Sequence, residues 1–399
     1  MAKSATPSHF PTTYYDHRMV NDTLLMELVE ADIAKNPQVA ESPIGSLDDF
    51  NHSFGRYLEH VLTQMRQDIR TRMQELIGYP PSAAEVDQAI AETPDLRDAV
   101  VALSIQYVLT LNFIAFHRKT FYLDDAIVER LSVTDMNAPA EYLRLPFKCC
   151  LFASRSPLLF KPLYQLSQRP QRHSTGTVSI FATERPEHDM RKIVFTIYHS
   201  DGNATHTLIK RELLIHPDWT IEQALRTDWN KVYEQNPDWK SNDSTIGDII
   251  GHNDHEEAFY QAGLPLFRII INALLYLGSN APDILEQVSP RQALLDNAKE
   301  TNSIAKRKKI RTKAKQYSSL DGAVVGSRFA RILIDKSTLP TNPTANGQHS
   351  HAGHRFLVRG HWRNQPHGPN RTERKLIFIE PFYKGDDMAE LINKPYVVI

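Results

Sequence analysis

The sequence predicts an α+β fold with a helical N-terminal region, a central antiparallel sheet with flanking helices, and a basic C-terminal β-hairpin. Apolar residues recur every three or four positions up to about residue 131, and the spacing changes to alternation after about residue 140. The last quarter of the chain is strongly basic. We therefore expect a helical domain at 1–140, an α+β domain at 141–298 and a basic RNA-binding or hairpin module at 299–399.

The helices of the first region are marked by their ends. A long amphipathic helix is expected from the cap at Ser46–Asp49 to Gly78, because Gly takes the left-handed conformation that ends a helix. Ser82 and Glu85 have the spacing of a capping box for a short second helix. Pro94 opens a third helix whose apolar run continues to Phe121, and a last short helix covers residues 124–131.

The central region changes to strands. Four segments rich in alternating apolar residues are expected to pair as an antiparallel sheet: Phe147–Ser154, Val178–Thr183, Lys192–His199 and His206–Leu214. Thr220 and Gln223 cap a helix that runs to about Asn236. Ile269–Leu277 belongs to a strongly apolar core helix, and Val324–Ile334 is expected to be a further strand.

Composition indicates a folded protein of a reducing compartment. Of the 399 residues, 41% are hydrophobic and 23% are charged. No signal peptide is expected, and the apolar run Leu103–Phe116 is shorter than a membrane span and contains polar residues. The only two cysteines, Cys149 and Cys150, are adjacent, which makes a disulfide between them awkward. We expect a protein of the host-cell cytoplasm with no membrane partner.

The net charge of −1 conceals an imbalance between the two ends of the chain. Residues 1–298 hold 27 Lys and Arg against 39 Asp and Glu, and residues 299–399 hold 19 against 8, so that charges of −12 and +11 give the total. Such a split is typical of a protein whose basic part meets a phosphate backbone. An acidic and a basic domain that dock on each other are the alternative.

Within the basic part, a helix that starts at Ser289–Pro290 has seven cations among ten residues in its second half. These are Lys306, Arg307, Lys308, Lys309, Arg311, Lys313 and Lys315. No acid interrupts the run, and like charges at helical spacing repel each other, so a polyanion such as RNA or the ribosome is the expected partner. A flexible basic linker without a ligand is the alternative.

A second cationic segment runs from His349 to Gly385. Two segments, His354–Val358 and Leu376–Phe382, predict the strands of a hairpin with a long polar loop. From His349 to Lys375 there are five His, five Arg, one Lys and a single acid. The candidate nucleic-acid contacts are Arg355, Arg359, Trp362, Arg363, Arg371 and Arg374. Trp362 would stack on a base or pack under the hairpin, and Gly360 would adopt a positive φ that turns its neighbours toward one ligand.

The same segment suggests chemistry. His354 and His361 are candidate catalytic residues, as general acid and base, and the flanking arginines could stabilise charge on phosphorus in a metal-independent ribonuclease. Binding of RNA without cleavage is the favoured alternative. The cluster His252–Glu257 is weak evidence for a metal site, and His349, His351 and His354 have better spacing but no Cys and few carboxylates nearby. There is no glycine-rich phosphate loop and no His-Glu-x-x-His or Gly-x-Ser-x-Gly motif, so no metal and no cofactor are expected.

The segment His354-Arg-Phe-Leu-Val-Arg-Gly-His-Trp-Arg363, followed by Gly368, Glu380-Pro381 and Lys384-Gly385, resembles the C-terminal signature of the second type V-A anti-CRISPR family and its phage and plasmid relatives. The similarity extends upstream through Leu145-Pro146 and Ala281-Pro-Asp-Ile284, over roughly residues 145–385. The chain departs from the family at Ile379, where a Trp is expected. The resemblance implies recognition of the nascent polypeptide of a type V-A CRISPR effector nuclease, followed by loss of its mRNA.

Overall fold

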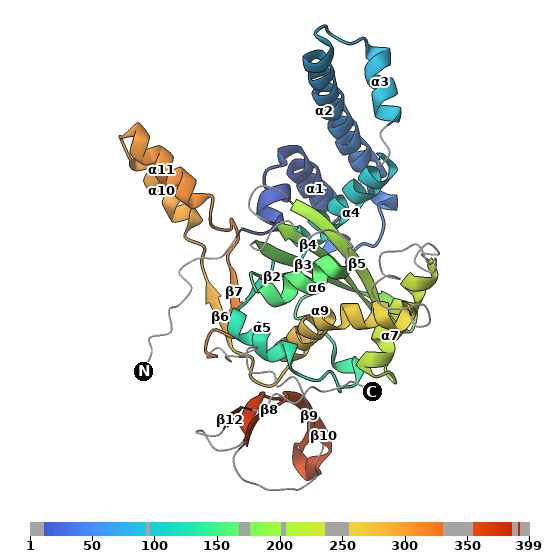
Figure 1. Cartoon of the computed structure of the whole chain (residues 1–399), viewed down its shortest axis with the longest axis vertical. Helices are drawn as coiled ribbons and strands as arrows, with labels where there is room; N and C mark the ends of the chain where they lie inside the picture. Colours follow the sequence, from blue (N-terminus) through green and yellow to red (C-terminus); the bar gives the residue numbers. More distant parts are fainter. Residues whose placement is uncertain are drawn as a thin grey trace.

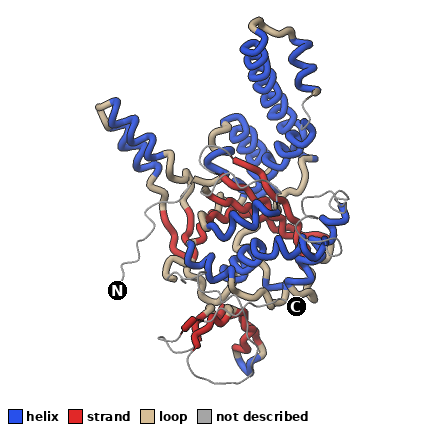
Figure 2. The backbone as a smooth tube through the Cα atoms, in the orientation of Figure 1, coloured by secondary structure: helices blue, strands red, loops and turns tan. Residues whose placement is uncertain are grey.

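A mixed seven-stranded sheet lies at the centre of the molecule, in the strand order β5-β4-β3-β2-β1-β7-β6 (Figures 1 and 2). The computed structural model describes residues 12–92, 96–166, 176–200, 205–235, 255–329, 354–384 and 390–391. The strands of the sheet are β1 (Thr120–Leu123), β2 (Cys149–Ser154), β3 (Thr177–Glu187), β4 (Met190–Ser200), β5 (Thr205–Ile215), β6 (Ile284–Gln287) and β7 (Gly322–Val325). The α+β class is confirmed.

The four predicted strands are β2 to β5, and each pairs antiparallel with its neighbour. The sheet is nevertheless mixed, because β1 runs parallel to both β2 and β7. Alternation along β4 separates two cores. Ile193, Phe195 and Ile197 are buried in the larger core that includes α9, whereas Tyr198 lies on the other face with residues of the N-terminal region.

Helices cover both faces of the sheet, and others project from it (Figure 1). The helices of the described residues are α1 (Thr23–Lys35), α2 (Asn51–Ile77), α3 (Ala83–Ala91), α4 (Leu96–Ala115), α5 (Asp125–Ser132), α6 (Pro157–Leu166), α7 (Ile221–Gln235), α9 (His255–Leu277), α10 (Arg291–Glu300) and α11 (Ile304–Ala314). α9 is the expected core helix. Its segment Tyr260–Leu277 is long and apolar enough to cross a membrane, but 72% of that segment is buried inside the fold, as in a core helix.

Predicted helix ends are confirmed where side chains cap the backbone. Gly78 follows α2 with a φ of 78°. Ser82 and Glu85 exchange both bonds of a capping box at α3. At the start of α7 the Thr220 N–H donates to Gln223 Oε1 at 2.8 Å, and the Gln223 N–H donates to Thr220 Oγ1 at 3.2 Å.

Two expectations for helices are wrong. The helix from Pro94 does not continue to Phe121, because α4 ends at Ala115 and His117 and Arg118 follow with φ of 66° and 55° before strand β1 begins. The helix from Ser289 is not continuous either. It divides into α10 and α11, and the Ser303 side chain caps α11 by accepting from the Lys306 N–H. Of the strand predicted at Val324–Ile334, only the first two residues are strand, at the end of β7, and residues 330–334 lie outside the described residues.

Two helical pairs, α2–α3 and α10–α11, project away from the body (Figure 1). The C-terminal strands form two small sheets below it. β9 (His361–His367) pairs with β10 (Glu373–Ile379), while β8 (His354–Val358) lies between β11 (Phe382–Lys384) and β12 (Glu390–Leu391). The expected long polar loop is therefore wrong. Residues 361–367 of it form strand β9, residues 373–375 begin β10, and the tight turn at 368–372 connects the two strands.

Both cysteines are free and buried, on strand β2. Cys149 lies in the core on the N-terminal side of the sheet and Cys150 in the core on the α9 side. Burial raises the pKa of the Cys149 thiol to about 12 and that of Cys150 well above its ordinary value. Adjacent strand residues point to opposite faces, which keeps the two thiols apart.

Candidate nucleic-acid interface

The projecting pair α10–α11, here called the basic arm, carries the cationic run. Six of its seven cations are exposed: Lys306, Lys308, Lys309, Arg311, Lys313 and Lys315. None of these six side chains makes an ion pair or a hydrogen bond with another residue that the structure describes. Because the arm stands clear of the body, its charges are free to meet an external anion (Figure 1).

The seventh cation, Arg307, has a structural contact instead. It is half-buried, and its Nε and Nη2 donate to the Thr301 carbonyl at 3.2 and 2.9 Å. That carbonyl follows the C-terminal end of α10, where a positive charge is favourable. Arg307 therefore holds the turn between α10 and α11, and it differs from the other six predicted contacts.

A buried carboxylate fixes the base of the basic arm. Asp16 is 4% exposed, and its Oδ1 accepts from the backbone N–H and the hydroxyl of Ser319, just after α11. The same oxygen lies 3.5 Å from Nη1 of Arg291, at the start of α10. The other oxygen accepts from Thr13. The N-terminal segment thus ties together both ends of the arm.

The pair β9–β10, here called the docked hairpin, packs against the body through Trp362. This side chain is 5% exposed, and its Nε1–H donates to Asn272 Oδ1 on α9 at 2.8 Å. Asn272 is fully buried, and its Nδ2 donates to the carbonyls of Leu131 and Thr134 at 3.1 and 2.9 Å. Phe378 packs beside Trp362, with ring centroids 5.0 Å apart. Trp362 packs under the hairpin, and the base-stacking alternative does not fit this structure.

The other side of the docked hairpin faces away from that packing. His361, Arg363, Gln365 and His367 alternate with Trp362 and Asn364 along β9, so they share the outer face. Arg363 is exposed and donates to Gln365 Oε1 at 2.7 Å. His361 and Arg363 are two residues apart on one strand face, roughly 7 Å from Cα to Cα. Of the predicted site residues, these two are brought together.

The two candidate catalytic histidines lie in different strands and in different sheets, His354 in β8 and His361 in β9. No described contact joins them, and the side chain of His354 is outside the described set. The same holds for the side chain of Arg355, whereas His349 and His351 lie outside the described residues altogether. Arg371 and Arg374 are exposed near the turn of the hairpin, and Arg371 has a φ of 57°.

Gly360 does not have the expected positive φ. A glycine is needed at this position because Thr134 and Pro381 pack closely against its Cα. A Cβ there would lie 2.4 Å from Thr134 Oγ1 and 2.9 Å from Pro381 Cδ. The Gly360 carbonyl accepts from the Asp135 N–H at 2.9 Å, and Nη1 of Arg359 lies 3.4 Å from Asp135 Oδ1. Arg359 therefore faces the body, and Arg359 and Arg363 do not flank a common ligand.

A cavity of about 670 Å³ lies beside this contact, between α7, α9 and the segment that follows α5. Trp219 and Tyr260 supply aromatic surface to it, and Arg268 of α9 lines it. The Nε of Arg268 is buried without a hydrogen-bond partner among the described residues. Burial, and then the charge of Arg359, lowers the pKa of Arg268, while Asp135 opposes the change. Arg268 brings a guanidinium to a cavity whose lining also contains Arg226 and four acidic residues, Asp135, Asp218, Glu222 and Glu257.

No group of three His, Cys, Asp or Glu side chains within the described part of the chain is arranged to hold a metal ion. Of the residues in the first weak metal motif, His252 lies outside that part and the side chain of His255 is not described.

The sequence of the chain matches the AcrVA2-like family, the anti-CRISPR type V subtype A2 family, over residues 121–383. This match spans well over half of the chain. The chain belongs to this family. The expected family membership is thereby confirmed, and the match at 121–383 agrees with the expected extent of roughly 145–385.

A crystal structure of AcrVA2 is similar at 12% identity, covers 84% of this chain and 96% of its own, and has a TM-score of 0.31. No curated protein matches the chain. The part that matches the family contains the basic arm, the docked hairpin and the cavity beside Arg268, whereas α1 to α4 precede it.

Several residues that shape these sites could not be predicted from the sequence. Asp16 is 303 positions from Ser319, and Asn272 is 90 positions from Trp362. No pattern in the neighbouring sequence predicts either contact. The one available signal was at Asn272 itself, since an amide inside the apolar segment Ile269–Leu277 must find a hydrogen-bond partner when buried.

Proposed function

We propose that this protein is an anti-CRISPR regulator that recognises the nascent polypeptide of a type V-A CRISPR effector and causes loss of its mRNA in the host cytoplasm. Family membership supports the target class. The observation that carries the RNA side of the proposal is the basic arm, with six exposed cations that have no acidic partner among the described residues. RNA of the message or of the translating ribosome is the polyanion that the arm would contact.

The peptide side of the proposal draws on the cavity beside Arg268. A nascent segment with an acidic side chain would pair with the Arg268 guanidinium, and Trp219 and Tyr260 would pack against neighbouring apolar groups. This cavity adjoins the contact between Arg359 and Asp135 that docks the hairpin. A peptide bound in this cavity would therefore lie next to the contact that docks the hairpin.

The alternative function is a metal-independent His/Arg endoribonuclease that acts on RNA directly. It is favoured by one observation, the placement of His361 and Arg363 on the same outer strand face. A general acid or base and a cation beside it would suffice for in-line cleavage next to a 2′-hydroxyl.

One experiment separates the two functions. Purified protein is incubated with end-labelled effector mRNA in EDTA and analysed on denaturing and native gels. The regulator predicts intact RNA with a mobility shift. Cleavage by the wild type that is lost in His361→Ala would contradict the RNA-binding regulator and support the endoribonuclease. RNA that is neither shifted nor cut would contradict both.

A cellular measurement tests the translational part. Effector mRNA is quantified with and without this protein, using the natural message and one whose start codon is removed. The proposal predicts loss of the translated message only, and Arg268→Gln should abolish that loss while the exposed control Arg72→Gln retains it. Equal loss of the untranslated message would contradict recognition of a nascent polypeptide.

A further inference from the structure

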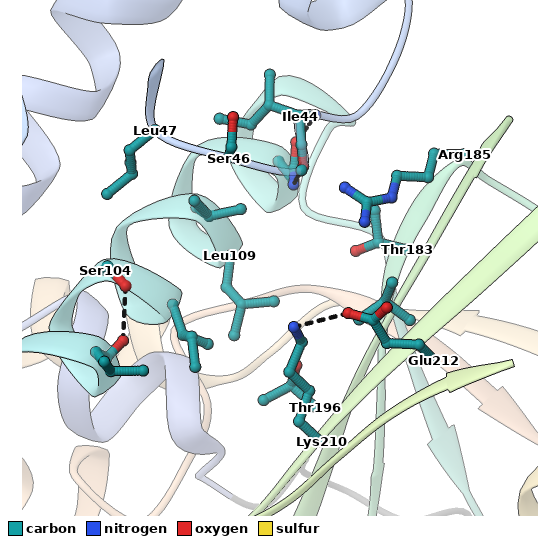
Figure 3. A pocket seen from close by; sticks show the side chains of 16 residues that line it. Ile44, Ser46, Leu47, Ser104, Leu109, Thr183, Arg185, Thr196, Lys210 and Glu212 are labelled. Atoms are coloured by element: carbon teal, nitrogen blue, oxygen red, sulfur yellow. Dashed lines mark hydrogen bonds and ion pairs between the residues drawn. The ribbon is translucent and has the colours of Figure 1, made fainter. Parts of the chain in front are cut away.

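A groove lies on the face of the sheet opposite α9. It is separate from the cavity beside Arg268, and neither the basic arm nor the docked hairpin contributes residues to it. It has a volume of about 400 Å³ and is bounded by α4, by the segment Ile44–Leu47 and by strands β3, β4 and β5 (Figure 3). Its walls formed by residues 44–47 and 101–112 precede the part of the chain that matches the family, 121–383. The family relationship therefore assigns no role to this groove.

The two sides of the groove differ in chemistry. The wall on α4 is apolar, with Val101, Ile105 and Val108, and Val101 is 51% exposed. The floor on the sheet is mostly polar, with Thr183, Thr196, Lys210 and Glu212. This floor exists because even-numbered residues of β4 and β5 face the groove, while odd-numbered ones such as Phe195 face the core around α9. A ligand that fits must be apolar on one side.

The groove is preformed. Asn112 of α4 holds the segment Ile44–Leu47 through two hydrogen bonds, accepting from the Ile44 N–H at 2.8 Å and donating to the Ile44 carbonyl at 3.0 Å. Asn112 is 1% exposed, so both bonds are shielded from water. A fixed wall lowers the entropic cost of binding, because no loop has to be ordered when the ligand arrives.

One cation in the groove makes no hydrogen bond and no ion pair with a described residue, although its charge acts on Glu187, whose pKa is lowered by Lys192 and, to a smaller extent, by this cation. Arg185 of β3 extends its guanidinium across the groove toward Ile44 (Figure 3). Its Nε is buried without a hydrogen-bond partner, and the side chain makes no ion pair with any residue that the structure describes. It lies directly against Gly45, where a Cβ would come within 1.4 Å of Nη1. Only glycine at position 45 leaves room for this placement.

The other charges of the floor are already balanced. Lys210 lies 2.8 Å from Glu212, and Lys192 lies 3.5 Å from the same carboxylate and 2.7 Å from Glu187. An incoming anion would therefore meet Arg185. A single carboxylate matches the planar fork of a guanidinium, whereas a phosphate would bring a second negative charge close to Glu212. A nucleic acid needs several cations in a row, which this groove lacks.

We infer that this groove binds a short peptide segment of a partner protein in which an acidic side chain lies next to apolar side chains. The carboxylate pairs with Arg185, and the apolar side chains rest on Val101, Ile105 and Val108 of α4. The groove shares no residue with the basic arm or with the cavity beside Arg268. It would add a second peptide contact to the proposed function, but the inference does not depend on that function.

The test uses an array of acetylated hexapeptides in which three central positions vary among Leu, Val, Phe, Asp, Glu, Asn and Gln. Full-length protein is applied as wild type, Arg185→Gln, Ser104→Trp, which fills the groove from α4, and Arg72→Gln, an exposed arginine outside the groove. Thermal unfolding of each variant verifies its fold. If Ser104→Trp does not fold, Arg185→Gln alone decides the result.

The wild type and Arg72→Gln should bind peptides that combine Leu, Val or Phe with Asp or Glu about ten-fold more tightly than their Asn or Gln counterparts, the factor expected for a charge-assisted hydrogen bond. Arg185→Gln should lose that preference, and Ser104→Trp should lose binding. Equal binding of acid and amide peptides, retention of the preference in Arg185→Gln, or no binding by any peptide would overturn the inference.

Discussion

The basic arm and the docked hairpin are both rich in cations, and the sequence suggests the same ligand for each. In the arm, six of seven cations extend into solvent without an acidic partner among the described residues. At the docked hairpin, Arg359, which precedes β9, lies 3.4 Å from Asp135, and Trp362 donates to the buried Asn272. Arg363, Arg371 and Arg374 are exposed on the hairpin itself. The difference teaches that a side chain in a cationic motif is available to a ligand only where it is not already used to hold the fold together.

The comparison implies that the two regions respond differently to mutation. Changes on the inner face of the docked hairpin should lower stability, because they remove buried contacts. Changes in the arm should leave stability alone and alter binding, since exposed charges contribute little to folding.

The largest effect is expected for Trp362→Ala. Removing a side chain that is 5% exposed and packs beside Phe378 should lower the free energy of unfolding by about 3–5 kcal/mol. Chemical denaturation with urea measures it. The matched control is the neighbouring Arg363→Ala on the outer face, which should stay within about 0.5 kcal/mol of the wild type. If both variants are equally stable, the hairpin is not docked through Trp362.

Asn272→Ala should come next. It leaves the Trp362 N–H and the carbonyls of Leu131 and Thr134 without this partner in a buried site. One such orphaned group costs about 1–3 kcal/mol, and partial relaxation should keep the total below that of Trp362→Ala. A double-mutant cycle with Trp362→Phe, measured by the same denaturation, should show a coupling of about 0.5–3 kcal/mol. Additive effects would show that the two side chains do not interact.

Gly360→Ala is expected to cost about 1–3 kcal/mol by crowding, because its Cβ would come within 2.4 Å of Thr134 Oγ1. Adding Thr134→Ala should recover part of the loss, which a thermal melt of the single and double variants would reveal. A Gly360→Ala protein as stable as the wild type would mean that this glycine is not held at a close approach.

Much of this fold could be predicted from local patterns. Helix caps such as Ser82 with Glu85, and the alternation from Cys149 to Leu214, are set by neighbours in sequence, and the structure confirms them. Strand β1 was not separated from α4, although the polar residues 117–120 interrupt the apolar pattern between them, and the chain breaks there through the positive φ of His117 and Arg118. The break at Ser303 did have a local signal, its capping side chain.

The candidate site was harder to predict, because contacts between segments distant in sequence decide which of its side chains are exposed. The sequence indicates that Trp362, Arg359 and the arm cations matter, but not which of them face water. That distinction rests on Asn272, Asp135 and Asp16, which approach from distant segments. Residue type and spacing predict the chemistry of a side chain, whereas long-range packing decides whether the side chain is available.

The central claim is that the arm, and not the inner face of the hairpin, contacts the polyanion. The most direct test is the slope of the logarithm of the RNA association constant against the logarithm of salt concentration. It is measured for the wild type, for Lys308, Lys309, Arg311 and Lys313 changed together to Gln, and for a control with Arg56, Arg66, Arg70 and Arg72 of α2 changed to Gln. The arm variant should lose about 0.7–0.9 of slope for each lost contact at unchanged stability, and the control should match the wild type. A wild-type slope in the arm variant would contradict the account.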